Sequence, residues 1–131
     1  MSIERQTIAG PDVPPTIGPY SPGVRAGEFL YVSGQAGLDP ETGDLAGESL
    51  GVQARQAMRN VESVLRAGGS RLDLVVNTTV LVTDIGEFPL VNEVFAEAFP
   101  VDPPARMVMQ VPLPGALLIS IGCVAVVESS V

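Results

Sequence analysis

The sequence predicts an α+β fold, in which one mixed sheet carries two helices on one of its faces. Three observations predict it. The length of 131 residues fits a single domain spanning residues 1–131 and is too short for two. Runs of β-branched residues and two amphipathic helical patterns follow the order strand, strand, helix, strand, helix, strand, strand. With 46% hydrophobic and 17% charged residues, the chain is too apolar to be disordered.

The first half of the chain contains a loop, strands and the clearest helix. The segment Pro11–Pro22 is rich in proline and glycine, which predicts an ordered loop. The aromatic and β-branched run Phe29–Gln35 predicts a strand, and one further strand is expected before the helix. Apolar residues then recur at helical spacing over Leu50–Leu65. Ser49 is the expected N-cap of this helix, and Gly68 is expected to end it.

The next strand and the second helix follow directly. The β-branched run Leu74–Thr83 predicts the strand. Asp84 and Glu87 have the spacing of a capping box, which predicts the start of a helix with an apolar stripe over Phe88–Phe99. Pro100 ends the helical pattern, because proline cannot continue a helix.

Two more strands are expected at Ala105–Val111 and Ala116–Val127. The second of these runs is almost entirely apolar, as expected for a strand that is covered on both faces. Two helices on one face leave the other face bare, and no third helical pattern occurs in the sequence. Another subunit is therefore the expected cover, and the mean hydropathy of +0.34, high for a small monomer, agrees with this.

Charge and composition exclude several classes of function. The chain has 15 acidic residues and 7 basic residues, all arginine, and its net charge is −8, so a nucleic-acid partner is not expected. Histidine is absent, which excludes triads and zinc sites that use histidine. The single cysteine, Cys123, excludes a disulfide framework. No metal site is expected, and no cofactor is expected because nucleotide-binding glycine motifs are absent.

The chain is expected to be cytoplasmic. The segment Met1–Gly10 is polar and mixed in charge, unlike a signal or transit peptide. The longest apolar run, Ala116–Val127, is shorter than the roughly 20 residues that a membrane helix needs. No membrane contact is therefore expected.

Arg106 is the residue that chemistry alone singles out. It follows Pro103–Ala105, where two prolines stiffen the backbone, and it opens an apolar strand. A partly buried guanidinium needs an anionic partner, because an unpaired buried charge is costly. Its planar fork matches a carboxylate in two parallel hydrogen bonds. The partner is either an anionic ligand or one of the chain's own carboxylates.

Five other residues are candidates for substrate binding, each with an ordinary structural alternative. Tyr20 lies in a rigid Gly-Pro-Tyr-Ser-Pro turn and presents a phenol, or it packs on the surface. Ser33 and Gly34 end a strand, where glycine permits close backbone approach to a ligand or forms a bulge. Asn92 lies on the second helix and either binds a ligand or faces solvent. Met107 alternates with a second methionine, a pattern typical of packing.

Five stretches of the sequence, in this order, resemble one known family. They are IGPYSPGVRAGEFLYVSGQ, LDPETGDL, VQARQAMRNVESVLRAGGS, TTVLVTDIGEFPLVNEVFAEAF and PPAR. They resemble the reactive intermediate deaminase family, also called the RidA, YjgF or L-PSP endoribonuclease family, and the resemblance as a whole runs from about Ile17 to Val127.

The resemblance implies a chorismate-mutase-like unit that assembles into a homotrimer with clefts between subunits. It implies hydrolysis of reactive enamines and imines, such as 2-aminoacrylate, to 2-keto acids and ammonia. The family's carboxylate-binding arginine corresponds to Arg106 and its loop tyrosine to Tyr20. Its ligand-contacting glycine corresponds to Gly34, its asparagine to Asn92, and the pocket residue after the arginine to Met107.

One departure from the family concerns the last strand. Family members usually carry a glutamate there, in a run like IEIEAIA, that orients or activates the attacking water. The corresponding run is Ile119–Ala125, in which Ser120 replaces that glutamate. Arg106, Tyr20 and Ser120 are thus the expected catalytic residues, with weak or altered deaminase activity. The alternatives are a non-catalytic small-carboxylate-binding or interaction protein on the same fold and, less favoured because histidine and lysine are absent, an endoribonuclease.

Overall fold

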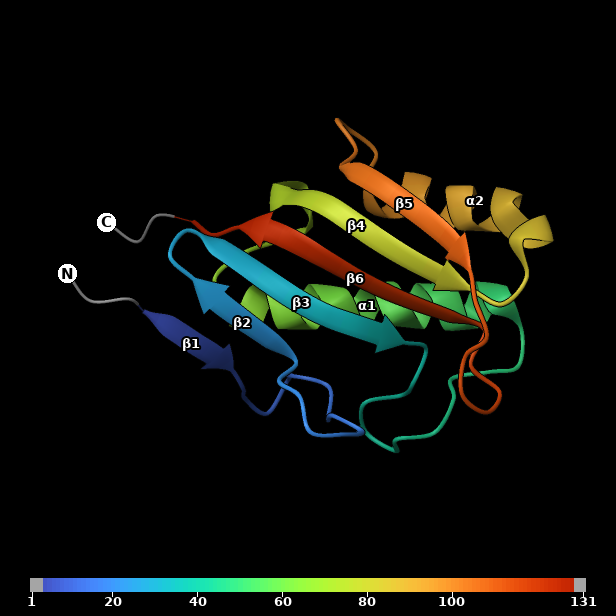
Figure 1. The fold of residues 1–131 in the computed structure, drawn as a ribbon, viewed down its shortest axis with the longest axis horizontal. Helices are drawn as coiled ribbons and strands as arrows, with labels where there is room; N and C mark the ends of the chain where they lie inside the picture. Colours follow the sequence, from blue (N-terminus) through green and yellow to red (C-terminus); the bar gives the residue numbers. More distant parts are fainter. Residues whose placement is uncertain (1–3, 129–131) are drawn as a thin grey trace.

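The computed structural model describes residues 4–128 and contains one sheet with two helices on one of its faces (Figure 1). The strands are β1 (Arg5–Ile8), β2 (Gly23–Ala26), β3 (Phe29–Ala36), β4 (Val75–Val82), β5 (Ala105–Gln110) and β6 (Ile119–Val126). The helices are α1 (Leu50–Ala67) and α2 (Phe88–Ala98), and short 3-10 turns, η1 (Leu72–Leu74) and η2 (Ile85–Glu87), precede β4 and α2. The predicted α+β fold is confirmed, while the predicted domain limits at residues 1 and 131 lie outside the described residues.

The sheet is mixed, as predicted. Its strand order is β1-β2-β3-β6-β4-β5, and every neighbouring pair is antiparallel except β4 and β5. The parallel pair is joined through α2, because parallel strands need a crossover connection. This connection places β5 at one edge of the sheet, with Arg106 opposite Thr78 of β4.

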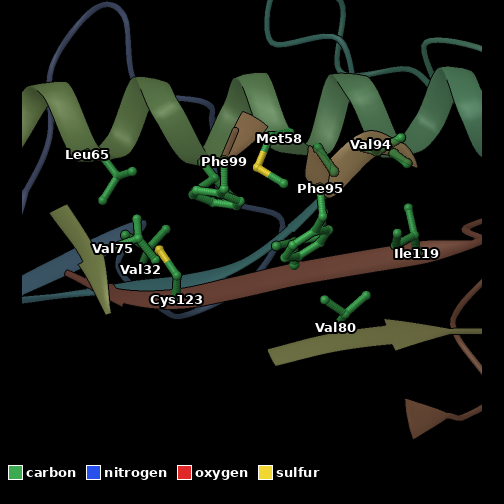
Figure 2. Close-up of a cluster of buried hydrophobic side chains, with 14 of the residues drawn as sticks. Val32, Met58, Leu65, Val75, Val80, Val94, Phe95, Phe99, Ile119 and Cys123 are labelled. Carbon is green, nitrogen blue, oxygen red and sulfur yellow. The ribbon is translucent and has the colours of Figure 1, made fainter. Parts of the chain in front are cut away.

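The core lies between the sheet and the two helices. Along β6 every second side chain is buried under the helices, beginning with Ile119, while the alternate side chains, beginning with Ser120, lie on the opposite face. Figure 2 shows Met58 of α1 and Phe95 of α2 reaching toward the strands in this layer. No helix of residues 4–128 covers the opposite face of the sheet, which we call the open face (Figure 1). Its cover by another subunit stays a prediction.

The capping residues predicted for α1 are confirmed. The hydroxyl of Ser49 accepts a hydrogen bond from the backbone N–H of Val52 at 3.3 Å. At the other end, the backbone N–H of Gly68 donates to carbonyl groups of the last turn. Gly69 follows at a φ of +83°, a conformation that glycine adopts without strain.

Three local predictions are wrong, and the first two concern β1 and the start of α2. β1 lies within a segment whose composition indicated no strand, because Arg5, Gln6 and Thr7 are exposed at the sheet edge and leave no alternating apolar pattern. The capping box is also not formed. The carboxylate of Asp84 instead accepts a hydrogen bond from the N–H of Gly86 at 2.9 Å and so caps the turn η2. The helix α2 begins after Glu87, and the Glu87 side chain makes no capping hydrogen bond.

The last strand begins later than predicted because a buried glutamine holds the residues before it. Gln53 of α1 is completely buried, and its amide donates to the carbonyl groups of Gly47 and Ala116. Its side-chain oxygen accepts from the N–H of Leu118 at 2.9 Å. The backbone of Ala116 and Leu118 is therefore bonded to a helix side chain, and β6 begins at Ile119.

Candidate functional site

Arg106 lies on the edge strand β5, and its side chain points toward α2. The central guanidinium carbon is 4.9 Å from the ring centre of Phe95 and 5.2 Å from that of Phe88. Contacts of this length with aromatic rings stabilise a cation by roughly 0.5–2 kcal/mol each. The two phenylalanines therefore hold the guanidinium in place through its faces and leave its hydrogen-bonding edges available.

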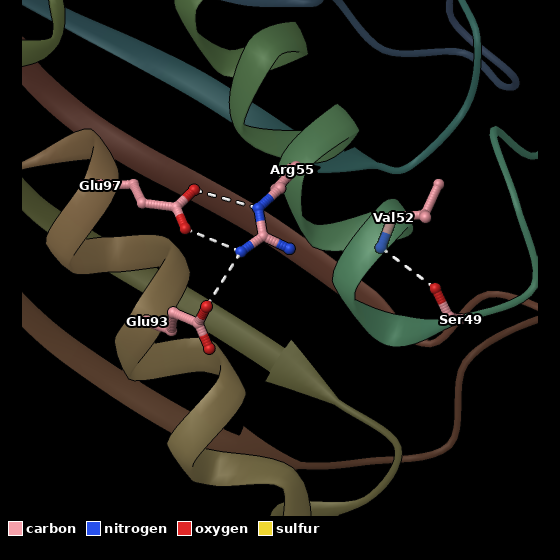
Figure 3. Close-up of polar contacts among 5 residues, drawn as sticks. All are labelled: Ser49, Val52, Arg55, Glu93 and Glu97. Atoms are coloured by element: carbon pink, nitrogen blue, oxygen red, sulfur yellow. Dashed lines mark hydrogen bonds and ion pairs between the residues drawn. The ribbon is translucent and has the colours of Figure 1, made fainter.

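The guanidinium of Arg106 has no hydrogen-bonding or ionic partner within residues 4–128. Arg55 shows the contrast, because its guanidinium bonds to Glu97 at 2.7 Å and to Glu93 at 3.4 Å (Figure 3). The hydrogen bond from Arg55 lowers the pKa of the Glu97 carboxyl below its ordinary value. The internal salt bridge considered for Arg106 is thus not formed within the described part of the chain.

A hollow of about 540 Å³ opens beside Arg106, and we call it the arginine hollow. Asn92 of α2 lines it together with Arg106, so the structure brings these two sequence-predicted residues together. Its remaining lining is Phe95, Ala96, Phe99, Pro100, Pro103 and Pro104. Phe88, Phe95 and Phe99 all belong to the predicted apolar stripe of this helix, and the helical pattern gave no sign that Phe88 and Phe95 pack on the guanidinium.

The loop between α2 and β5 has an unusual backbone. Asp102 has a φ of +48°, in the left-handed region that non-glycine residues seldom adopt. Pro103 and Pro104 follow, each with its φ fixed by the ring. The three residues determine how the chain enters β5, and thereby where Arg106 lies.

Tyr20 and Ser33 are joined through one loop. The hydroxyl of Ser33 donates to the carbonyl of Ser21 at 2.6 Å, and its backbone N–H donates to the carbonyl of Pro22 at 2.9 Å. The phenol oxygen of Tyr20 accepts from the N–H of Ile17 at 3.2 Å. Ser33 thus fixes the loop that carries Tyr20, and its hydroxyl is already occupied by this bond.

Gly34 lies in a break in the pairing of β3 with β6, and its Cα faces the side chain of Ser120, which itself pairs with Ala36. Regular pairing of β3 with β6 breaks between Val32 and Gln35, so the bulge alternative for this glycine is confirmed. The hydroxyl oxygen of Ser120 is 2.6 Å from the position that a Cβ on Gly34 would occupy. Gly34 and Ser120 line a hollow of about 350 Å³ on the open face, the serine hollow.

The serine hollow has a neutral polar lining. Asn77 and Thr79 of β4 lie in it with Ser120, and none of its lining side chains is a carboxylate, an arginine or a lysine. Cys123 also borders it, but burial raises the pKa of this thiol to about 12. The thiol therefore stays protonated near neutral pH and is a poor nucleophile. Among residues 4–128 no cluster of potential metal ligands occurs.

The arginine hollow and the serine hollow are separate within one chain. Arg106 points to the helix side, whereas Met107 lies on the open face and is 58% exposed. The strands β3 and β5, which carry Gly34 and Arg106, are separated by β6 and β4. With neighbouring strands ~4.8 Å apart, the two residues are ~14 Å apart across the sheet. One chain does not place both groups around a small substrate.

The sequence matches one protein family over most of its length. The family described as endoribonuclease L-PSP matches residues 11–127. The human protein named 2-iminobutanoate/2-iminopropanoate deaminase is 40% identical over 126 residues, which cover 95% of this chain and 92% of the human one. The Arabidopsis thaliana protein named Reactive Intermediate Deaminase A, chloroplastic, is 37% identical over 125 residues, covering 95% of this chain and 67% of its own.

Solved structures show the same fold. RidA from the Antarctic bacterium Psychrobacter sp. PAMC 21119 has a TM-score of 0.89 at 36% identity, covering 93% of this chain and 99% of its own. Escherichia coli TdcF, crystallised with bound serine, has a TM-score of 0.85 at 31% identity, covering 94% of this chain and 99% of its own.

In the described range, neither helix is long and apolar enough to cross a bilayer. One relative is named as chloroplastic, so the cytoplasmic location stays a prediction. On these matches of sequence and fold, the chain belongs to the reactive intermediate deaminase family, also called the RidA, YjgF or L-PSP endoribonuclease family.

Proposed function

We propose that the protein hydrolyses 2-imino acids derived from amino acids to 2-keto acids and ammonia. The observation that carries this proposal is the half-buried guanidinium of Arg106, which has no protein partner within residues 4–128 and lies beside Asn92. A carboxylate is the ligand that this fork fits best. The names of the human and Arabidopsis relatives support the choice of an imine as substrate.

The reaction needs little more than positioning. Arg106 binds the carboxylate through its free edge, and Asn92 lies within the same hollow to hydrogen-bond the imine nitrogen. Water adds its oxygen to the imine carbon and one proton to the nitrogen, which gives a carbinolamine. The hydroxyl proton then passes to the nitrogen as the carbon–nitrogen bond breaks and the carbonyl forms, leaving the 2-keto acid and ammonia. An enamine such as 2-aminoacrylate first tautomerises to the imine. Holding the reactants together in this way lowers the barrier by several kcal/mol.

A second copy of the chain completes the site in this proposal. Tyr20, Gly34 and Ser120 lie far from Arg106 in one chain, so a neighbouring subunit supplies them at a cleft between subunits. The open face supports such an assembly, because it carries exposed apolar residues that include Tyr31, at 50% exposure, and Met107. A homotrimer is the arrangement that the family resemblance implies.

The rate is expected to be low because Ser120 stands where relatives usually have a glutamate. The Ser120 hydroxyl orients the attacking water but does not accept its proton as a carboxylate does. Loss of a general base typically lowers a rate by 10²–10⁴-fold. Weak hydrolysis that still exceeds the uncatalysed reaction is the expected result.

The test is release of ammonia and 2-keto acid from freshly generated 2-aminoacrylate. The wild-type protein should exceed the blank, and Arg106→Ala should abolish the difference. Arg59→Ala is the control, since Arg59 is exposed and its guanidinium bonds only to Gln56 among the described residues. No acceleration over the blank by the wild-type protein would contradict the proposal.

A second candidate is a non-catalytic protein that binds small carboxylic acids through Arg106. The absence of a carboxylate from the serine hollow favours it. In that case 2-ketobutyrate should raise the melting temperature of the wild-type protein but not of Arg106→Ala, while no imine is consumed.

A further inference from the structure

A buried threonine on β4 lies directly beside Arg106. Thr78 is the register partner of Arg106 in the parallel pair of β4 with β5, so the two side chains point to the same face of the sheet. Thr78 is 1% exposed, and its hydroxyl donates a hydrogen bond to the carbonyl of Ala105, the residue before Arg106, at 3.1 Å. We infer that Thr78 is a positioning residue, which fixes the start of β5 and thereby holds the Arg106 guanidinium where it binds the substrate's carboxylate. This inference rests on the proposed function and adds to it a residue that acts through Arg106.

Packing alone does not explain the hydroxyl of Thr78. On the helix-facing side of β4 the next residues are Val80 and Val82, which are buried and aliphatic. Valine has the same branched shape as threonine and would fill the same space without burying a polar group. A buried hydroxyl destabilises a fold unless it is hydrogen-bonded, and its partner here is the backbone next to the functional arginine. The hydroxyl therefore links β4 to the first residue of β5.

The start of β5 has few other ties to the sheet. Within the chain β5 is an edge strand that pairs with β4 alone. Pro103 and Pro104 precede it and have no backbone N–H, so neither residue can donate a hydrogen bond to a neighbouring strand. The register of β5 with β4 begins at Ala105. The Thr78 hydroxyl thus adds a side-chain bond at the point where the backbone pairing starts.

Arg106 is in this way held by two elements. Its side chain packs on the rings of Phe88 and Phe95, which belong to α2 and fix the guanidinium relative to that helix. Its backbone follows Ala105, which Thr78 fixes relative to β4. A guanidinium and a carboxylate form two parallel hydrogen bonds only when they are well aligned. A displaced backbone at Arg106 therefore weakens binding of the carboxylate in the substrate and in the transition state alike, and raises KM more than it lowers kcat.

The test separates the hydroxyl of Thr78 from its methyl group. Thr78→Val removes only the hydroxyl, Thr78→Ser removes only the methyl group, and Thr78→Ala removes both. The two readouts are the dissociation constant of 2-ketobutyrate, measured by calorimetry, and KM for the imine that an amino-acid oxidase generates in the assay from 2-aminobutyrate. Both should rise by about threefold to tenfold in Thr78→Val and Thr78→Ala and stay within about twofold of wild type in Thr78→Ser. The value of kcat should stay within about twofold in all three variants.

Ser70→Ala is the matched control. Ser70 is 7% exposed, and its hydroxyl donates to the carbonyl of Val126, the last residue of β6, at 2.7 Å. The substitution removes the same kind of buried bond between a hydroxyl and a strand, but it lies outside both the arginine hollow and the serine hollow. It should lower the melting temperature as Thr78→Val does and leave the dissociation constant and KM unchanged.

The outcomes separate this inference from the proposed function. Values that follow the methyl group instead of the hydroxyl would overturn the inference and leave deaminase activity standing. A Thr78→Val protein that melts at a lower temperature but keeps the wild-type dissociation constant and KM would do the same. The comparison of Thr78→Ser with Thr78→Ala isolates the hydroxyl a second time, so the result does not depend on the folding of Thr78→Val.

The binding measurement decides the role of Thr78 even without turnover. If the wild-type protein consumes the imine no faster than the blank, the proposed function fails, and the dissociation constants of 2-ketobutyrate alone support or overturn the inference. A wild-type protein that neither binds 2-ketobutyrate nor hydrolyses the imine would overturn both.

Discussion

The hydroxyl of Ser120 occupies the space that a side chain on Gly34 would need. Its oxygen is 2.6 Å from the ideal Cβ position of that glycine, whereas the Cβ of Ser120 is at 3.9 Å, an ordinary contact distance. The bulge in β3 and the small side chain in β6 are thus fitted to each other. Ser120 is therefore part of the packing between β3 and β6, in addition to the role proposed for it in catalysis.

This pairing predicts that the two positions are energetically coupled. Gly34→Ala should lower the free energy of unfolding by about 1–3 kcal/mol, because the new methyl group displaces the Ser120 hydroxyl. In a Ser120→Ala background the same change should cost less, since the displaced oxygen is gone. Urea unfolding of the four proteins measures the coupling, and additive costs would contradict the close contact.

Replacement of Ser120 by glutamate should increase deaminase activity. A carboxylate at this position supplies the base that the neutral serine hollow lacks, and a gain of up to about 10²–10⁴-fold in kcat is expected. Ser120→Gln is the matched control, because it has the same size and no basic oxygen. Equal activity of the two variants would show that the base is not what limits the rate.

Gln53 should contribute strongly to stability. Gln53→Leu removes three hydrogen bonds and leaves the backbone groups of Gly47, Ala116 and Leu118 without their partner. A loss of about 3 kcal/mol in the free energy of unfolding is expected, because buried polar groups without partners are costly. A loss below about 1 kcal/mol, measured in urea, would mean that water or a shifted loop satisfies these groups.

The backbone at Asp102 predicts an order of stability among substitutions. Asp102→Gly and Asp102→Asn should be close to neutral, since both residues adopt a positive φ readily. Asp102→Val should cost about 1–2 kcal/mol, because its branched side chain clashes in this conformation. Thermal unfolding of the three variants tests the order, and a neutral valine variant would show that the loop relaxes to another conformation.

Cys123 should make stability depend on alkaline pH. Burial raises the thiol pKa to about 12 in the folded protein, above the ordinary value of 9.0. The unfolded thiol therefore ionises first, and the stability that Cys123 contributes is fully present below pH 9.0 and is lost as the pH rises toward 12. Cys123→Ala should show a smaller decrease of melting temperature over this interval, and an identical decrease would contradict the assignment.

The main elements could be predicted because their signals are local. The helical spacing of Leu50–Leu65 and the cap at Ser49 are properties of adjacent residues, and both are confirmed. β1 could not be predicted, since a short exposed edge strand is defined by its partner β2 and not by its own pattern. The start of β6 depends on Gln53, which lies 63 residues away from Ala116 in the chain.

The site was predictable in its residue types but not in its arrangement. Arg106 was found from its context and Asn92 from the family resemblance, and they share one hollow. Arg106 and Ser120 lie on opposite faces because of the register of β5 and β6 against β4, and strand order sets their distance across the sheet. Neither the register nor the order can be read from spacing in the sequence. The packing of Phe88 and Phe95 on the guanidinium was hidden, because an apolar stripe looks the same whether it contacts the core or a cation.

The Arg106 guanidinium, which has no ionic partner among residues 4–128, belongs to a chain of net charge −8. At long range an approaching anion meets the repulsion of the whole molecule, and only within a few ångströms does it meet the attraction of one cation. At 0.1 M salt the screening length is about 10 Å, so salt weakens the long-range repulsion between the anion and the whole molecule. The close contact between the anion and Arg106 is weakened less. Moderate ionic strength should therefore speed the encounter with an anionic substrate, opposite to the behaviour of enzymes that steer their ligands electrostatically.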